Sequence, residues 1–271
     1  MGLALMKALR SRLADTPHAD PASDFGAMRV SPCLRLETIL DSPGVPLQER
    51  LRHGWNPSDC SASFTVTADG LTAKRSPVAW STDSIRGKEG FSAGIHVWEI
   101  TWPAGQRGSH AVVGVSTAGA ALQAPGFSAL VGSDGESWGW ELGRNELHHG
   151  GATVGTYPLA GPAGSRSPLA VPDAVLVVLD ADAGTLGFAV DRHYLGTAFS
   201  GLGRGKFHPS VSAVWGDCEI GICYLNGMQR QPQPLMDLCR RAVRRSVGPE
   251  TETATRSLPL PSAAKRFLLY R

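Results

Sequence analysis

The chain has 271 residues, 42% of them hydrophobic, and a formal net charge of +2. This length and hydrophobic content suit a globular protein with a sizeable core. So small a net charge gives no support for a nucleic-acid or membrane partner, and we expect neither.

The first 32 residues predict a flexible N-terminal arm. Its apolar run before Lys7 is shorter than the core of a secretory signal, and no later run is long enough to span a bilayer. Five cysteines, odd in number and never spaced as Cys-x-x-Cys, fit neither a disulfide scaffold nor a zinc site. Free thiols indicate a reducing compartment, so we expect a soluble protein of the cytoplasm, in the cytosol.

The middle of the chain is typical of a β-rich domain, because 32 glycines and 19 prolines separate short apolar runs. Segment 95–102 alternates, and its even-numbered residues are expected to face the core. Turn signals recur roughly every ten residues, as in a β-sandwich. Further strands are predicted at 111–115, on either side of turns at 182–184 and 191–193, and at 208–216 and 218–225, with a turn near 215–217.

Two helices are predicted, a brief one at 34–40 and a well-patterned one at 235–247. In the second, apolar residues recur at the spacing of one helix face, at 235, 238, 239, 242, 243 and 247. The tail that carries it is too short to bury a core of its own. The apolar face therefore packs either on the preceding domain or on another protein, and its spacing leaves both open.

No catalytic motif is found. Ser116 and Ser128 lack the final glycine of a nucleophile elbow, and segment 201–206 has the wrong spacing for a phosphate loop. Asp180 and Asp182 are expected to cap a hairpin turn, and the pair at 148–149 to lie in a loop. We predict no enzyme activity, no metal site and no cofactor.

Aromatic residues give a better signal for binding. Trp215 stands at a strand-to-turn junction, where we expect it to be exposed, whereas the other strand tryptophans are expected in the core: Trp98, Trp102, Trp138 and Trp140. Segment 73–83 combines Arg75, Pro77, small residues and an aromatic ring, which is the chemistry of a peptide-binding pocket. An ordinary edge strand is the alternative, and the residues alone leave the two open.

Several long stretches carry a family resemblance that runs from about Cys33 to Arg271. They are RHGWNP, PVAWSTDSIRGKEGFSAGIHVWEITWPAGQRGSHAVVGVSTA, LVGSDGESWGWELGRNELHHG, VLVVLDADAGTLGFAVD, HPSVSAVWGDCEI and PLMDLCRRAVRRSVG. These stretches resemble the SPRY domain- and SOCS box-containing protein family. The resemblance implies a mainly β fold, with a bent antiparallel β-sandwich (the SPRY domain) at 33–231 and a small α-helical SOCS box at 232–271.

The same resemblance implies a substrate-recognition adaptor of an Elongin B/C–cullin-5 E3 ubiquitin ligase, which promotes ubiquitination and proteasomal degradation of its targets. The expected Elongin C contacts are Leu235, Leu238, Cys239, Ala242 and Val243, and the cullin-5 box maps onto Leu258, Pro259, Leu260 and Pro261. Proline is expected to hold that box in an extended conformation. The alternative is a SPRY protein-interaction scaffold without ligase recruitment, whose tail packs on its own domain.

The resemblance also implies that the SPRY domain binds a short Asp/Glu-x-Asn-Asn-Asn peptide, as found in inducible nitric oxide synthase. Arg75 is expected to pair with the acidic residue, and exposed backbone at 214–216 with asparagine amides. The site positions are Arg75, Pro77, Val78, Ala79, Trp80, Ser109, Phe127, Leu130, Val214, Trp215 and Gly216. Three depart from the family: Trp80 stands where glutamine is usual, Phe127 where tyrosine is usual, and Ser109 where threonine is usual.

Overall fold

The computed structural model describes residues 30–158, 169–229, 235–247 and 251–269. Most of the predicted N-terminal arm lies outside these residues. The last part of the arm already belongs to the sandwich, because the Val30 amide donates to the Tyr194 carbonyl at 2.7 Å. In the described ranges, no helix is both long and apolar enough to cross a bilayer.

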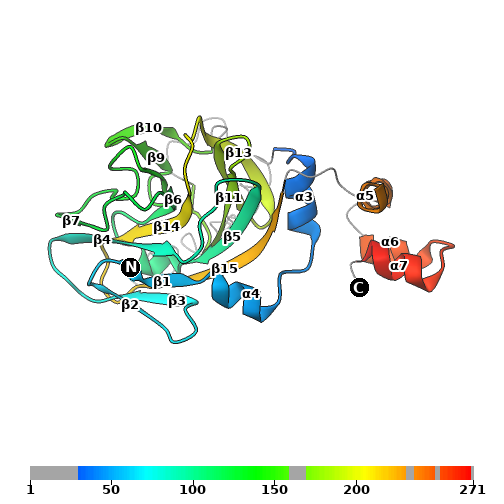
Figure 1. The fold of residues 1–271 in the computed structure, drawn as a ribbon, viewed down its shortest axis with the longest axis horizontal. Helices are drawn as coiled ribbons and strands as arrows, with labels where there is room; N and C mark the ends of the chain where they lie inside the picture. Colours follow the sequence, from blue (N-terminus) through cyan, green and yellow to red (C-terminus); the bar gives the residue numbers. More distant parts are fainter. Residues whose placement is uncertain (1–29, 159–168, 230–234, 248–250, 270–271) are drawn as a thin grey trace, which may run out of the picture.

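Two antiparallel sheets pack face to face, as the fold prediction required (Figure 1). In the part of the chain that the structure describes, sheet A has the order β1-β4-β14-β6-β8-β9-β10, with β7 paired to β4. Its strands are β1 (Trp55–Cys60), β4 (Ser81–Gly87), β6 (Val112–Ser116), β7 (Gln123–Pro125), β8 (Ser137–Glu141), β9 (Glu146–His149), β10 (Ala152–Thr156) and β14 (His208–Ala213).

Sheet B has the order β13-β12-β11-β5-β15-β3-β2. Its described strands are β2 (Phe64–Val66), β3 (Thr72–Arg75), β5 (Ile95–Thr101), β11 (Ala174–Asp180), β12 (Thr185–Val190), β13 (His193–Ser200) and β15 (Glu219–Met228). The strands predicted from the sequence are all present. The prediction missed β1, β2, β4, β7, β9 and β10. The expected loop at 148–149 was wrong because those residues form the end of β9.

The core lies between the two sheets. The even-numbered face of β5 is buried there as predicted, with Trp98 0% and Trp102 1% exposed. The opposite face of β5 is also buried, which alternation did not predict. Its residues Ile95 and Val97 form a second apolar cluster with helix α3 (Leu34–Asp41), which covers the outer side of sheet B (Figure 1).

The predicted turns are confirmed. The Asp180 carboxylate accepts hydrogen bonds from the amides of Asp182 and Ala183 at 3.1 and 3.0 Å, so Asp180 caps the β11–β12 hairpin. The Asp182 carboxylate, which was also expected to cap this turn, instead accepts from the Gly94 amide at 2.9 Å and pairs with Arg35. Asp191 and Arg192 have φ of 49° and 63° in the β12–β13 turn, where positive φ matches the twist of a two-residue hairpin.

The helices predicted at 34–40 and 235–247 are confirmed as α3 and α5 (Leu235–Val247). The sequence did not predict α4 (Leu47–Arg52), the 3₁₀ turn η1 (Ala104–Gln106), α6 (Thr251–Ser257) or α7 (Ser262–Leu268). The segment between α5 and residue 258 therefore contains a helix.

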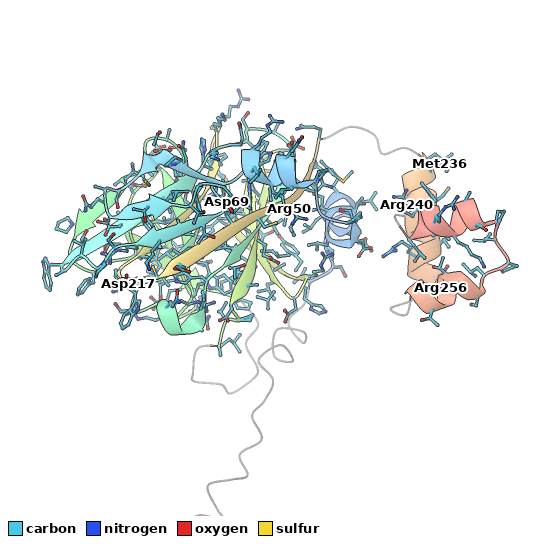
Figure 2. The ribbon with its side chains drawn as sticks, turned by 90° about the horizontal axis from the view of Figure 1, so that it is seen from below. Arg50, Asp69, Asp217, Met236, Arg240 and Arg256 are labelled. Atoms are coloured by element: carbon cyan, nitrogen blue, oxygen red, sulfur yellow. The ribbon has the colours of Figure 1, made fainter. Side chains whose placement is uncertain are left out.

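Helices α5, α6 and α7 contact one another and stand beside the α3 end of the sandwich (Figures 1 and 2). The Arg240 guanidinium lies 3.7 Å from the centre of the Phe267 ring, and Arg244 donates to the Leu268 carbonyl at 2.9 Å. Asp217, next to the β14–β15 turn, lies at the end of the sandwich remote from these helices (Figure 2). The two candidate sites are therefore at opposite ends of the molecule.

Candidate functional site

Four loops meet at the end of the sandwich that carries the predicted peptide site. They follow β3, η1, β7 and β14. A Cβ on Gly216 would lie 2.7 Å from Pro77 Cα, and a Cβ on Gly108 would lie 3.1 Å from Trp215 Cβ. The first of these contacts is closer than a side chain tolerates and the second is unusually tight, so glycine helps the loops to pack together.

The buried side chain of Arg75 connects these loops from the interior of the protein. Its side chain is 0% exposed, and it lies 2.9 Å (Nε) and 2.7 Å (Nη2) from an oxygen of Asp83, which is also 0% exposed. The remaining donors bind main-chain carbonyls, Val214 at 2.9 Å, Val78 at 3.2 Å and Ser81 at 2.9 Å. One guanidinium therefore fixes the chain on both sides of the site.

The role expected for Arg75 was wrong. Its charge is already paired with Asp83 and covered by protein, so it is not presented to an acidic residue of a ligand. Arg75 ends β3 in sheet B and Asp83 lies on β4 in sheet A, so the ion pair bridges the two sheets. Arg75 is a positioning residue.

The role expected for Leu130, contact with the ligand, was also wrong. It is 2% exposed, so it supports the site from the core instead of facing a ligand. The neighbouring Val131 amide donates to Ser212 Oγ at 3.1 Å, which ties this loop to β14. The other predicted positions reach the surface: Pro77, Val78, Ala79, Trp80, Ser109, Phe127 and Trp215 are exposed, and Val214 and Gly216 are half-buried.

The backbone between β14 and β15 is open to a ligand. The amides of Trp215 and Gly216 donate to no described residue, so they are available to an amide side chain or an extended peptide. The Trp215 indole is 52% exposed, as its place at a strand-to-turn junction predicted. This turn offers both polar and apolar contacts.

Two exposed aromatic rings border the site on its other side. Trp80 is 72% exposed and has φ of 59°, and its ring centre lies 5.5 Å from that of Phe127. The buried Thr82 hydroxyl donates to the Gly126 carbonyl at 2.8 Å and accepts from the Ser128 amide at 3.0 Å, which clamps the turn that carries Phe127. Thr82 and Asp83 of β4 and Ser212 of β14 were not predicted, because each binds a residue that only the folded structure brings next to it.

The ionisable groups beside the site are buried or paired. Burial raises the pKa of the Cys218 thiol, beside Arg75, to about 11, so the thiol is protonated and a poor nucleophile at neutral pH. The surface charges near the β14–β15 turn are paired, with Lys74 3.8 Å from Asp217 and 3.7 Å from Glu219. Among the described residues, no group of three or more His, Cys, Asp or Glu could hold a metal ion.

Helix α5 presents a second candidate site. Leu235 is 75% exposed, and Cys239 and Ala242 are also exposed. Successive helical residues turn by about 100°, so these three share one face, opposite the face from which Arg240 and Arg244 contact α7. Val243 is half-buried, and the Leu238 side chain lies outside the described part of the chain.

The segment between α6 and α7 differs from its expected conformation. The Leu260 amide donates to the Leu258 carbonyl at 2.8 Å, which makes a tight turn around Pro259 in place of an extended run. Pro261, with φ of −56° and ψ of 151°, is the N-cap residue that precedes α7. Leu258 is half-buried, whereas Pro259, Leu260 and Pro261 are exposed.

Comparison with known proteins finds two known units in the chain. The SPRY domain matches residues 95–226 and the SOCS box matches residues 231–269. The chain is 50% identical over 238 residues to SPRY domain-containing SOCS box protein 1 of Mus musculus, covering 88% of this chain and 87% of that protein. It is 48% identical over 265 residues to SPRY domain-containing SOCS box protein 2 of Rattus norvegicus, covering 97% of this chain and 99% of that protein. It is also 48% identical over 241 residues to Protein gustavus of Drosophila melanogaster, covering 88% of this chain and 86% of that protein.

Proposed function

The chain belongs to the SPRY domain-containing SOCS box proteins, and from this premise we propose that it is the substrate-recognition adaptor of an E3 ubiquitin ligase. The observation that carries the proposal is the apolar face of α5. Leu235, Cys239 and Ala242 are left uncovered by the sandwich and by α6 and α7. An apolar helix face of this kind binds a hydrophobic groove on a partner protein.

In the finer form of the proposal, this face binds Elongin C of the Elongin B–Elongin C pair. The exposed prolines and Leu260 between α6 and α7 select cullin-5. The small Cys239 and Ala242 side chains allow close approach of the partner, while Leu235 fills a pocket. The ligase ubiquitinates the bound substrate and so directs it to the proteasome. The site of action is the cytosol, where the five free cysteines stay reduced.

The substrate is a protein with an Asn-Asn-Asn-containing segment, of the kind found in inducible nitric oxide synthase. It binds across the loops after β3, η1, β7 and β14. The free amides of Trp215 and Gly216 and the carbonyls of the same turn suit the side chains of asparagine, which both donate and accept. The buried Arg75 gives no support for the acidic first residue of the expected motif.

Co-purification tests the ligase half of the proposal. The full chain is expected to recover Elongin B and Elongin C, and a Leu235→Ser/Cys239→Phe double variant is expected to lose both, because it removes the anchor and blocks close approach. Met236 provides a matched control: it is 62% exposed on the same helix but points about 100° away from Leu235. Met236→Ser should therefore recover both Elongins like the wild type.

The same experiment can contradict the proposal. Failure of the wild type to recover Elongin B and Elongin C would reject it. Equal recovery by the double variant would reject the assignment of the binding face to Leu235 and Cys239. Circular dichroism and the melting temperature of the double variant show whether the fold is intact, and both substituted side chains are exposed.

A further inference from the structure

Trp80 combines a backbone conformation and an exposure that local energetics do not favour. Its φ of 59° lies in the left-handed region, which is uncommon for a bulky residue, and its side chain is 72% exposed. Such strain persists only where the surrounding structure imposes it, and it is concentrated at functional sites. Trp80 therefore needs an explanation beyond packing.

The surrounding structure holds Trp80 rigidly. Its carbonyl accepts from the Gly126 amide at 2.9 Å, and the next residue, Ser81, is already paired with Pro125 in the β4–β7 ladder. Phe127 follows in the turn that Thr82 clamps, and it is 50% exposed. Two aromatic rings thus project from a fixed frame, with centres 5.5 Å apart and planes inclined by 60°. A rigid aromatic pair loses little conformational entropy when it binds.

The segments that carry this pair are uncharged. Residues 76–82 and 111–133 contain no Asp, Glu, Lys or Arg, and the buried charges of Arg75 and Asp83 are paired with each other. An acidic side chain placed against the rings would lose water and gain no partner, which is costly. A large apolar side chain would lose only unfavourable contact with water.

The pair is continuous with the proposed peptide site. Trp80 directly follows the exposed Pro77, Val78 and Ala79, and Arg75 binds the Val78 carbonyl on one side and the Val214 carbonyl on the other. Figure 1 shows β4 and β7 at the end of the sandwich away from α5. A peptide that contacts the β14–β15 turn can extend directly onto the rings.

We propose that Trp80 and Phe127 form a specificity subsite for one large apolar or aromatic side chain next to the asparagine segment of a substrate peptide. This inference rests on the proposed peptide-binding function and narrows its substrate class. The chain selects neutral peptides with an apolar flank over peptides with an acidic flank. The occupant is an extended segment of a partner protein, and Trp80 and Phe127 are its specificity-determining residues.

Fluorescence polarisation with the full chain tests the subsite. The probes are labelled peptides in which a central Asn-Asn-Asn is flanked by three alanines on each side. In each peptide, one flanking alanine is replaced by Phe, Leu or Asp, and all six flanking positions are tested. At one position, Phe and Leu are expected to bind about tenfold tighter than Ala, and Asp no tighter than Ala.

Variants assign the effect to the rings. Trp80→Gln is expected to reduce the preference for Phe and Leu to about twofold or less, while Trp80→Phe retains it. Val154→Gln is the matched control, because Val154 is an apolar residue with 54% exposure on β10, at the opposite edge of sheet A from β4 and β7. It should leave every affinity unchanged.

The outcomes separate the subsite from the peptide-binding function itself. If Asn-Asn-Asn peptides bind but no flanking Phe or Leu improves affinity, or the improvement survives Trp80→Gln, the subsite is overturned and the peptide site stands. Tighter binding of an Asp flank than of an apolar one overturns it as well. If peptides with Ala-Ala-Ala in place of Asn-Asn-Asn bind equally, or no peptide binds, both proposals are overturned.

Discussion

Arg75 and Asp83 show how one buried ion pair can serve a binding site without touching the ligand. Both side chains are 0% exposed, and the Arg75 guanidinium also binds four main-chain carbonyls. A buried pair of this kind contributes little net stability compared with apolar residues, but it is costly to break. Its role is to fix the relative position of the loops that the ligand contacts.

Replacement of Arg75 by Met should therefore be strongly destabilising. We expect the free energy of unfolding, measured in urea, to fall by about 3–5 kcal/mol, because Asp83 is left as an uncompensated buried charge. The adjacent Lys74→Met is the control, since Lys74 is 49% exposed and its pair with Asp217 is at 3.8 Å, and it should change stability by less than about 1 kcal/mol. Similar effects of the two substitutions would contradict the structural role of Arg75.

His96 makes stability depend on pH. Burial lowers the pKa of His96 to about 4 from its ordinary 6.5, and its ring contacts the Tyr224 hydroxyl at 2.9 Å and the Ala93 carbonyl at 3.0 Å. The unfolded chain therefore binds the proton more readily than the folded one. The contribution of His96 to the free energy of unfolding is fully present above pH 6.5. It falls by about 3 kcal/mol as the pH drops toward 4.

Urea unfolding of wild type and His96→Gln between pH 7 and pH 4 checks this dependence. Carboxylates that titrate in the same range affect both proteins, so the informative quantity is the difference between their free energies of unfolding. We expect that difference to shrink by about 3 kcal/mol as the pH falls. A constant difference would show that His96 does not contribute.

At the scale of elements, α3 and α5 have the same kind of apolar pattern, but they differ in whether the apolar face is buried. The apolar residues of α3 are buried against β5 and β11 in the second cluster. The residues of α5 at the same spacing, Leu235, Cys239 and Ala242, stay exposed, and its arginines contact α7 instead. An amphipathic pattern thus predicts a helix with a face to cover, but not what covers it.

The structure also shows which elements a sequence pattern can reveal. Core strands such as β5, β6 and β11 were predicted because their apolar residues alternate or run continuously. The core strand β4 was missed because its sequence, STDSIRG, is mostly polar although every residue is buried. Strand β10 was missed because its side chains are mostly exposed and give no such pattern. Helices α6 and α7 were missed because each has 7 residues, which is two turns and too few for a clear period.

On the scale of the whole molecule, the sandwich and the helical group are connected by few contacts. Neither apolar cluster includes a described residue beyond Met228. An ion pair at 3.8 Å joins Arg244 of α5 to Asp41 at the end of α3, and Asp41 is 42% exposed. This arrangement suits an adaptor, whose substrate and ligase surfaces have to bind at the same time.

Deletion of residues 232–271 should therefore leave the sandwich almost unchanged. Loss of one partly exposed ion pair costs up to about 1 kcal/mol, or about 2–4 °C in melting temperature for a domain of this size. All seven tryptophans precede the deleted segment, so their fluorescence reports the melting of the sandwich in both proteins. A larger fall would favour the scaffold alternative, in which the tail packs on its own domain.

The sequence by itself determined the sandwich, the helix at 235–247, the exposed Trp215 and the positions of the loops that form the site. These follow from local periodicity, turn chemistry and family resemblance, all of which are present along the chain. Only the tertiary structure decided that Arg75 is buried, that both faces of β5 are covered and that the face of α5 with Leu235 is not. The physical reason is that burial depends on contacts between distant segments: Asp83 reaches Arg75 from the opposite sheet, and α3 reaches β5 from outside it.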